Sequence, residues 1–227
     1  MENLLEYAPL LAGGALTTIA LALFSLALAT VLGAGGAALK LAPGRIGRGV
    51  AFLYTTLVRG VPDLVLILLI YFGGQRLIND LGALVDAPYI EVSKFWAGVA
   101  AIGFIYGAYL SETFRGAYLG VPRGQGEAAY ALGLSRLRVL LLVTGPQVVR
   151  LALPGYANVW MVLVKSTAVV SVIGLQDLVG LADKAGKATR EPFLFFLAVI
   201  VVYLAITSAS NWAFARLEAR VNRGQMA

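Results

Sequence analysis

The sequence contains no cysteine and no histidine, and charged residues make up only 13% of its 227 residues. The lack of cysteine rules out disulfide bonds and thiol nucleophiles. The lack of histidine removes imidazole bases and the commonest side-chain metal ligand. Soluble domains carry about 25% charged residues, so the low charge also disfavours a soluble domain. We therefore expect no catalytic residues and no metal site in this chain, and we do not expect an enzyme.

Long apolar stretches take the place of the missing charge, and 59% of the residues are hydrophobic. About 20 apolar residues are needed to cross a bilayer as a helix. Lipid leaves backbone groups no water to bind, which favours helices over open strands. The sequence predicts an all-α integral membrane protein, a single domain over residues 1–227 with five transmembrane helices. The spans are expected at about 10–39, 50–74, 95–119, 151–175 and 192–214.

The net charge of +6 is distributed unevenly among the connections between these spans. The first connection carries Lys40, Arg45 and Arg48 with no acid, and the third connection and the tail, which includes Arg223, are also mainly basic. The second and fourth connections mix both signs. Because cytoplasmic loops collect Lys and Arg, we predict a bacterial inner-membrane protein with its amino terminus outside and its carboxyl terminus in the cytoplasm.

The third connection, about residues 120–150, is the most informative segment. It predicts a short helix over residues 125–132, ended by Gly133 in a left-handed conformation. Ser135 is expected to cap a second short helix, and Pro146 is expected to break that helix before the fourth span. Two short helices at a sharp angle would form a compact protrusion on the cytoplasmic side.

Five residues of this segment have a recognisable spacing. Glu127-Ala128-Ala129, followed by Gly133 and then Pro146, resembles the EAA signature of ABC importer permeases. The resemblance implies a type I ABC importer permease fold, in which this segment forms cytoplasmic coupling helices. It also implies that these five residues contact a separate ATPase subunit. An amphipathic interfacial helix without a partner is the alternative.

Three further segments extend the resemblance over nearly the whole chain. Residues 54–64, 103–116 and 165–168 are similar to the second, third and fourth spans of polar amino-acid permeases, in particular histidine/lysine/arginine/ornithine and opine permeases. The resemblance implies ATP-driven import of polar, more specifically basic, amino acids. It implies as partners two ATP-binding subunits, a second permease chain, identical or sister, and an external solute-binding protein, with no nucleic acid.

The chain itself lacks a phosphate-binding loop. Such a loop requires Gly, four residues, Gly-Lys and then Ser or Thr. Neither Lys165-Ser166 nor Gly186-Lys187 stands in that pattern. We therefore expect no cofactor on this chain, and we expect ATP and Mg²⁺ to bind to the partner ATPase.

Polar side chains inside the predicted spans are candidates for the substrate path, because a charge at the bilayer centre costs about 2.5–3.5 kcal/mol. A basic amino acid presents two cations and one carboxylate, which suits a cavity with an acid and a cation. The residues expected to line the path are Asp63, Glu112, Asn158, Lys165 and Ser166.

Internal ion pairs are the alternative interpretation of these charges. Arg59 and Asp63 are four residues apart, and Glu112 and Arg115 are three apart, so each pair would share one face of a helix. Lys165 would, on this view, extend toward the outer surface of the membrane.

Two other classes of function remain open at this point. A secondary transporter or channel would work without ATP, but such folds often contain paired halves, and five spans do not divide in that way. An integral membrane enzyme would need clustered acids or metal ligands at one face. Co-purification of an ATPase subunit separates both from an ABC permease.

Overall fold

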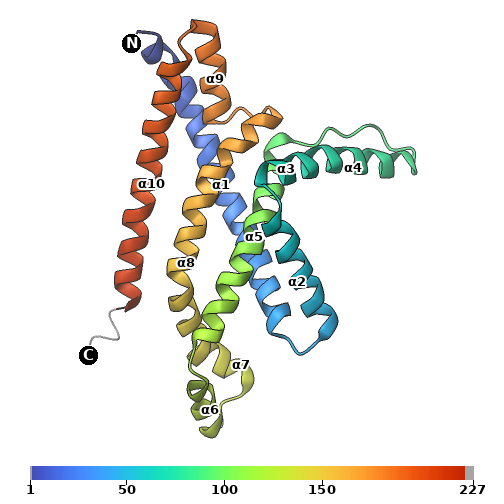
Figure 1. The fold of residues 1–227 in the computed structure, drawn as a ribbon, viewed down its shortest axis with the longest axis vertical. Coiled ribbons are helices and arrows are strands. Elements are labelled where there is room, and N and C mark those ends of the chain that lie inside the picture. The colour runs from blue at the N-terminus through green and yellow to red at the C-terminus, as the bar shows by residue number, and fades with distance from the viewer. Residues whose placement is uncertain (1, 223–227) are drawn as a thin grey trace.

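The computed structural model describes residues 2–222, which form helices joined by short connections (Figure 1). The elements are α1 (Glu2–Leu41), α2 (Arg45–Gly60), α3 (Asp63–Leu68), η1 (Leu69–Gly73), α4 (Gly74–Ala83), α5 (Lys94–Gly120), α6 (Arg123–Ala131), α7 (Arg136–Val139), η2 (Leu140–Thr144), α8 (Gly145–Ser166), η3 (Thr167–Ile173), α9 (Leu178–Thr189) and α10 (Pro192–Asn222). Arg223, part of the predicted basic tail, lies outside the described residues.

Helix α5 occupies the centre of the molecule, and α1, α2 and α8 pack around it (Figure 1). Small residues on α5 allow this close packing. A Cβ at Gly103 would stand 2.6 Å from the side chain of Leu28, and one at Gly107 would stand 2.8 Å from the Cβ of Leu32. Both positions therefore require glycine, and α1 and α5 form the core against which the other helices pack.

Four helices among residues 2–222 are long and apolar enough to cross a membrane, whereas the sequence predicted five. They are Asn3–Leu41, Asp63–Ala83, Arg136–Ile173 and Pro192–Asn222. The predicted span 95–119 does fold as one long helix, α5, but α5 is not among the four. Three of its glycines are buried against other helices, and its glycines, tyrosines and charged residues lower its mean hydropathy below that of a fully apolar span.

The predicted second span, 50–74, is not one helix. Helix α2 ends at Gly60, Val61 is extended, and α3 begins at Asp63 directly after Pro62. Proline has no amide hydrogen, and it disfavours helical conformation in the residue before it. The apolar helix that follows runs from Asp63 to Ala83, about ten residues later than predicted.

The third connection contains the two predicted short helices, α6 and α7. Gly133 has a φ of +80°, which confirms the left-handed position after α6. Ser135 stands at the start of α7, but its side chain makes no capping hydrogen bond.

The prediction that Pro146 breaks the helix was wrong. A π-helical turn, η2, joins α7 to α8, and the Gly145 amide donates to the carbonyl of Leu140 five residues earlier. The wider turn accommodates the missing proline donor without a break, so one helix continues into α8. A Cβ at Gly145 would lie 2.5 Å from the Leu140 oxygen, so this turn requires a glycine.

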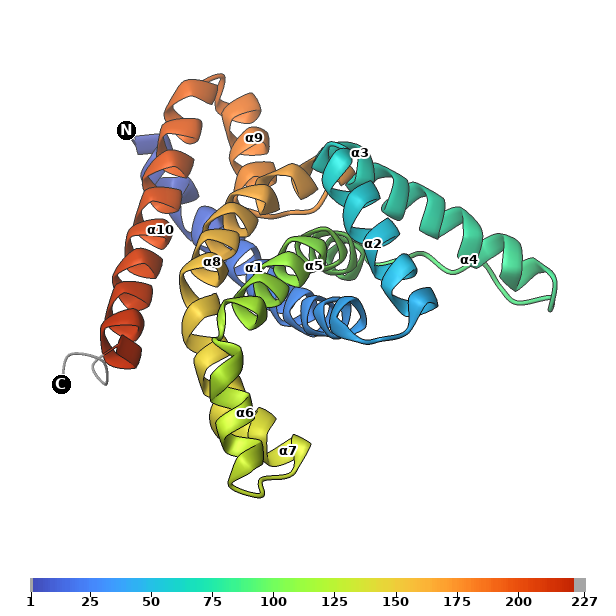
Figure 2. The same cartoon turned by 60° about the horizontal axis from the view of Figure 1, so that its bottom comes forward.

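Two parts of the chain project from the bundle in different directions, as Figures 1 and 2 both show. One is the α6–α7 protrusion at the lower end. The other is the arm of α3, η1 and α4. The side chains of Gln75 and Asn79 on this arm bind the backbone of Ile90 and Val92, so the return segment is fastened along α4.

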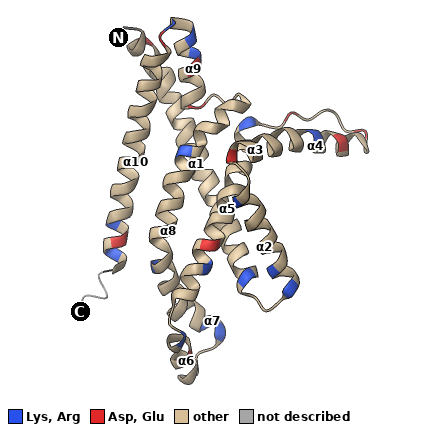
Figure 3. Cartoon of the chain, viewed as in Figure 1, with Lys and Arg blue, Asp and Glu red and all other residues tan. Residues whose placement is uncertain are grey.

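The predicted cytoplasmic connections gather at one end of the molecule. The α1–α2 connection, the α6–α7 protrusion and the carboxyl end of α10 lie at the lower end in Figure 1, whereas the amino terminus and α9 lie at the upper end. Figure 3 shows mostly Lys and Arg at the lower ends of α2, α7 and α10, and both signs of charge on α4 and α9.

Candidate functional site

A polar stripe runs along one face of α5. Tyr106, Tyr109 and Glu112 recur at intervals of three residues, which places them on one side of a helix. The Tyr106 and Tyr109 rings stack with their centroids 5.6 Å apart and an interplanar angle of 28°. Two clusters of polar side chains, described next, lie at the two ends of this stripe.

The first cluster joins α3, α5 and α8 around one carboxylate, and we call its residues, Asp63, Tyr106 and Ser166, the Asp63 cluster. The Tyr106 hydroxyl donates to Asp63 Oδ2 at 2.8 Å, and the Ser166 hydroxyl donates to the same oxygen at 3.3 Å. The two hydroxyls also contact each other. Asp63 reaches this position because α3 begins immediately after the Val61–Pro62 break.

Asp63 has no cationic partner within 4.0 Å among the described residues. The alternative pairing with Arg59 was wrong: the guanidinium carbon of Arg59 lies 5.3 Å from the centroid of the Tyr109 ring instead. The extended backbone at Val61 interrupts the helix between the two residues, so the four-residue spacing no longer brings them together. Two hydroxyl groups bind the carboxylate, and no cation of the described chain pairs with it.

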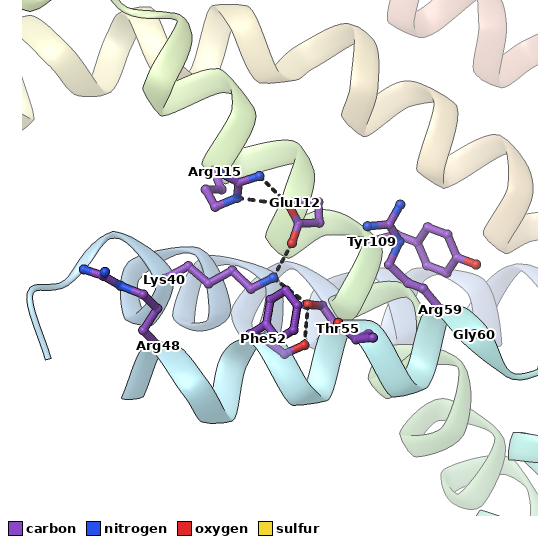
Figure 4. A pocket seen from close by; sticks show the side chains of 10 residues that line it. Lys40, Arg48, Phe52, Thr55, Arg59, Gly60, Tyr109, Glu112 and Arg115 are labelled. Atoms are coloured by element: carbon purple, nitrogen blue, oxygen red, sulfur yellow. Dashed lines mark hydrogen bonds and ion pairs between the residues drawn. The ribbon is translucent and has the colours of Figure 1, made fainter. Parts of the chain in front are cut away.

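The second cluster joins α1, α2 and α5 around Glu112, and we call its residues, Lys40, Thr55, Glu112 and Arg115, the Glu112 cluster (Figure 4). Arg115 Nη2 lies 2.9 Å from Glu112 Oε2, which confirms the predicted intrahelical pair. Lys40 binds both Glu112 and Thr55, and its side chain is only 7% exposed. Here the carboxylate is paired with two cations.

The Glu112 cluster and Arg59 line a cavity of about 720 Å³ between α1, α2 and α5. Its charged lining residues are four bases and one acid, namely Lys40, Arg48, Arg59, Arg115 and Glu112. The opposite face of α2 lines an apolar groove with α1 and α5. Helix α2 thus separates a basic polar cavity from an apolar surface.

The structure brings together only some of the predicted path residues. Asp63 and Ser166 share one cluster, and Glu112 lies at the other end of the polar stripe. Asn158 and Lys165 are exposed on α8, and Lys165 lines a groove against α9 and α10 rather than the cavity. These two residues therefore lie apart from the site.

Sequence reasoning missed three residues of the two clusters, namely Tyr106, Lys40 and Thr55. Tyr106 lies within a segment already compared with polar amino-acid permeases, and its spacing from Glu112 was the available signal. Lys40 stands 72 residues before Glu112 and was read as a loop cation. No local spacing indicates that pair.

The α6–α7 protrusion is well exposed. Glu127 and Ala128 face outward on α6, whereas Ala129 is buried against the rest of the protrusion. Leu132, Leu137 and Leu141 are all more than half exposed. Pro146 lies at the beginning of α8, beyond the protrusion. The protrusion therefore presents apolar surface together with the outward-facing carboxylate of Glu127.

No group of acids within residues 2–222 is arranged to hold a metal ion.

The comparisons with known proteins place these features in context. Residues 29–223 match the family described as binding-protein-dependent transport system inner membrane component.

The chain is 46% identical to the histidine/lysine/arginine/ornithine transport system permease protein HisQ of Escherichia coli (strain K12), over 93% of this chain and 92% of that protein. It is 38% identical to the octopine transport system permease protein OccQ of Rhizobium radiobacter, over 91% and 88%. A solved structure described as an amino acid ABC transporter with histidines aligns with a TM-score of 0.83 at 29% identity, covering 96% of both chains.

Proposed function

The chain belongs to the family of binding-protein-dependent transport system inner membrane components, and from that premise we propose that it forms the substrate path for basic amino acids. As a member of that family it is a multi-pass inner-membrane permease subunit of an ABC importer, not an enzyme. Family membership also implies a separate ATPase subunit and a solute-binding protein as partners.

The observation that carries the choice of substrate is the Asp63 cluster. A carboxylate held by two hydroxyls, without a cationic partner in the described chain, suits an ammonium or guanidinium group. The relatives named for histidine, lysine, arginine, ornithine and octopine support this choice. Ser166 belongs to the same site, and the path continues along the polar stripe toward Glu112. Asn158 and Lys165 have no part in this version of the path.

The orientation of the chain in the membrane follows from the charges at the two ends of the molecule. We place the α6–α7 protrusion and the carboxyl terminus in the cytoplasm and the amino terminus outside. This orientation is supported by the basic residues at the lower end of the molecule. On this placement α5 also crosses the membrane, although it is not among the four most apolar helices, and neighbouring helices cover much of its surface. All five crossings then belong to one domain over residues 1–227.

The protrusion is the contact with the ATPase. Its exposed leucines and Glu127 offer an apolar patch with one acid to a partner protein. Gly133 sets the bend between the two short helices. Two ATPase subunits, which bind the ATP and Mg²⁺, then act on the protrusions of two permease chains, identical or sister, and the helices alternate the path between its two openings.

Reconstituted transport tests the proposal. The complex of permease, ATPase and solute-binding protein is placed in liposomes, and ATP-dependent uptake of labelled arginine is measured. Asp63→Asn removes the charge but keeps a hydrogen-bond acceptor, so uptake should fall at least about tenfold while assembly stays normal. The matched control Asp80→Asn alters an exposed acid on α4 and should leave uptake unchanged.

Normal uptake by an assembled Asp63→Asn complex would remove this acid from the path. Purification of the permease without any ATPase subunit would instead favour an ATP-independent transporter. Transport in the absence of ATP would point the same way.

A further inference from the structure

Arg59 is a cation without an acid in the polar cavity. It stands in the last turn of α2, and within residues 2–222 it makes neither a hydrogen bond nor an ion pair. The cavity's other cations are engaged: two belong to the Glu112 cluster, and Arg48 donates to the carbonyl of Ala42. Arg59 is therefore the cavity cation whose donors are available to a ligand.

The Tyr109 ring holds the guanidinium in place. The guanidinium carbon lies 5.3 Å from the ring centroid, over the face of the ring, in a cation–π arrangement. The N–H donors lie in the guanidinium plane, and within residues 2–222 none of them is used in a hydrogen bond or an ion pair. A planar fork of this kind matches a carboxylate, which accepts two parallel hydrogen bonds from it. Figure 4 shows Arg59 beside Tyr109 at the edge of the cavity.

Arg59 and Asp63 each contact one of two neighbouring tyrosines, and they are not paired with each other. Tyr106 donates to Asp63, the Arg59 guanidinium lies over the Tyr109 ring, and the two tyrosine rings are stacked on each other. A cation and an acid four residues apart would ordinarily pair with each other. Here the break at Val61–Pro62 and the tyrosine pair keep both charges available for a ligand that carries the opposite charges.

We propose that Arg59 binds the α-carboxylate of the amino-acid substrate while Asp63 binds a cationic group of the same molecule. The proposal rests on the proposed function and assigns a recognition group for each end of the substrate. It makes the permease itself selective for α-amino acids, independently of the solute-binding protein. A cationic amine without a carboxylate would lose the contact with Arg59.

Equilibrium binding to the purified permease–ATPase complex, without solute-binding protein, tests this assignment. The probes are arginine and agmatine, its decarboxylated analogue. The unmodified complex should bind arginine at least about tenfold more tightly than agmatine. Arg59→Gln should lower arginine affinity about tenfold to a hundredfold and leave agmatine affinity unchanged. Arg59→Lys, which keeps the charge but loses the fork, should give an intermediate loss.

Three outcomes would overturn the assignment: equal affinity for the two probes in the unmodified complex, an equal loss for both probes in Arg59→Gln, or unchanged arginine affinity in that variant. Thermal unfolding of each variant separates loss of the site from loss of the fold. The Asp63→Asn complex should lose affinity for both probes. If it loses neither, the proposed role of Asp63 fails, whereas a selective loss in Arg59→Gln still supports the carboxylate contact.

An acidic phospholipid head group is the other anion available to Arg59. The same measurements in nanodiscs with and without phosphatidylglycerol distinguish the two. An Arg59→Gln effect on arginine that persists in neutral lipid supports the carboxylate contact. An effect that requires phosphatidylglycerol would overturn it.

Discussion

The two clusters along α5 differ in how their acids are satisfied. Glu112 accepts from two cations, one of them almost fully buried, and its charge is balanced within the chain. Asp63 accepts from two hydroxyls and has no cation nearby in the described structure. Both acids are half-buried, so burial alone does not distinguish them.

The difference indicates two roles. A carboxylate that already has its cations ties helices together and leaves little to offer a ligand. A carboxylate held only by neutral donors keeps its charge available. The comparison therefore assigns helix packing to the Glu112 cluster and ligand binding to the Asp63 cluster, and each of the following changes tests that division.

The largest effect on stability is expected at Glu112. Glu112→Leu leaves the Lys40 ammonium with the Thr55 hydroxyl but without an anionic partner, at a site where its side chain is 7% exposed, so the variant should lose about 3 kcal/mol of stability. The double variant Lys40→Met/Glu112→Leu removes the stranded charge and should recover most of the loss. Thermal unfolding of the purified complex measures both. If the Glu112→Leu variant were as stable as the unmodified protein, the helix-packing role assigned to the Glu112 cluster would be wrong.

A third acid widens the comparison beyond the polar stripe. Asp177 caps α9 by accepting from the Gly180 amide, and one of its carboxylate oxygens is buried without a partner among the described residues. Burial raises the pKa of the Asp177 carboxyl from its ordinary value of 3.8 to about 6, although the hydrogen bond from Gly180 opposes the shift. The folded protein thus binds this proton more tightly than the unfolded chain.

The sign of the pH effect follows from that pKa. The Asp177 contribution to stability is complete below about pH 4 and is lost as the pH rises through about 6. Asp177→Asn keeps a capping side chain and should remove about 3 kcal/mol of that pH dependence. Unfolding temperatures of both proteins from about pH 4 to about pH 8 measure it. Parallel curves for the two proteins would contradict the assigned pKa.

A smaller effect is expected at the tyrosine hydroxyls. Tyr106→Phe removes a hydrogen bond to the Asp63 carboxylate and should cost about 1.5 kcal/mol of stability. The matched control is Tyr109→Phe, because the Tyr109 hydroxyl makes no hydrogen bond within residues 2–222 and its ring stacking is retained. Chemical denaturation of the two variants measures both stability losses. Equal losses would show that the hydrogen bond from Tyr106 to Asp63 does not stabilise the fold.

The smallest effect is expected at an exposed ion pair. On α9, Lys187 Nζ lies 2.6 Å from Asp183 Oδ2, but the Asp183 and Lys187 side chains are 42% and 74% exposed. Water screens such a pair, so Asp183→Asn should change stability by less than about 0.5 kcal/mol. The same unfolding assay provides the baseline for the Glu112 result. A loss of stability comparable to that of Glu112→Leu would mean that burial does not determine how much an ion pair contributes to stability.

The sequence predicted features that depend on local spacing. Apolar length predicted most of α1 and α10, the Glu112–Arg115 interval predicted their pairing, and the left-handed Gly133 followed from its position after a short helix. These predictions were confirmed because neighbours along a helix decide them.

Other features depend on helices that meet in space. Tyr106 lies 43 residues from Asp63, and Lys40 lies 72 residues from Glu112, so no local pattern reveals either contact. Local rules also failed where the backbone departs from an α-helix. The helix is interrupted before Asp63, so Arg59 and Asp63 do not pair. The π-helical turn before Pro146 lets the helix continue through that proline.

Protection of a single thiol tests most directly whether the Asp63 cluster is the place where substrate binds. The chain has no cysteine, so Ser166→Cys introduces one reporter beside Asp63, to be studied with cysteine-free partner subunits. The rate of its modification by a positively charged methanethiosulfonate is measured with and without arginine, with alanine as the control ligand. We expect saturating arginine to slow the modification at least about tenfold and alanine to have no effect. An equal rate with and without arginine would contradict the account.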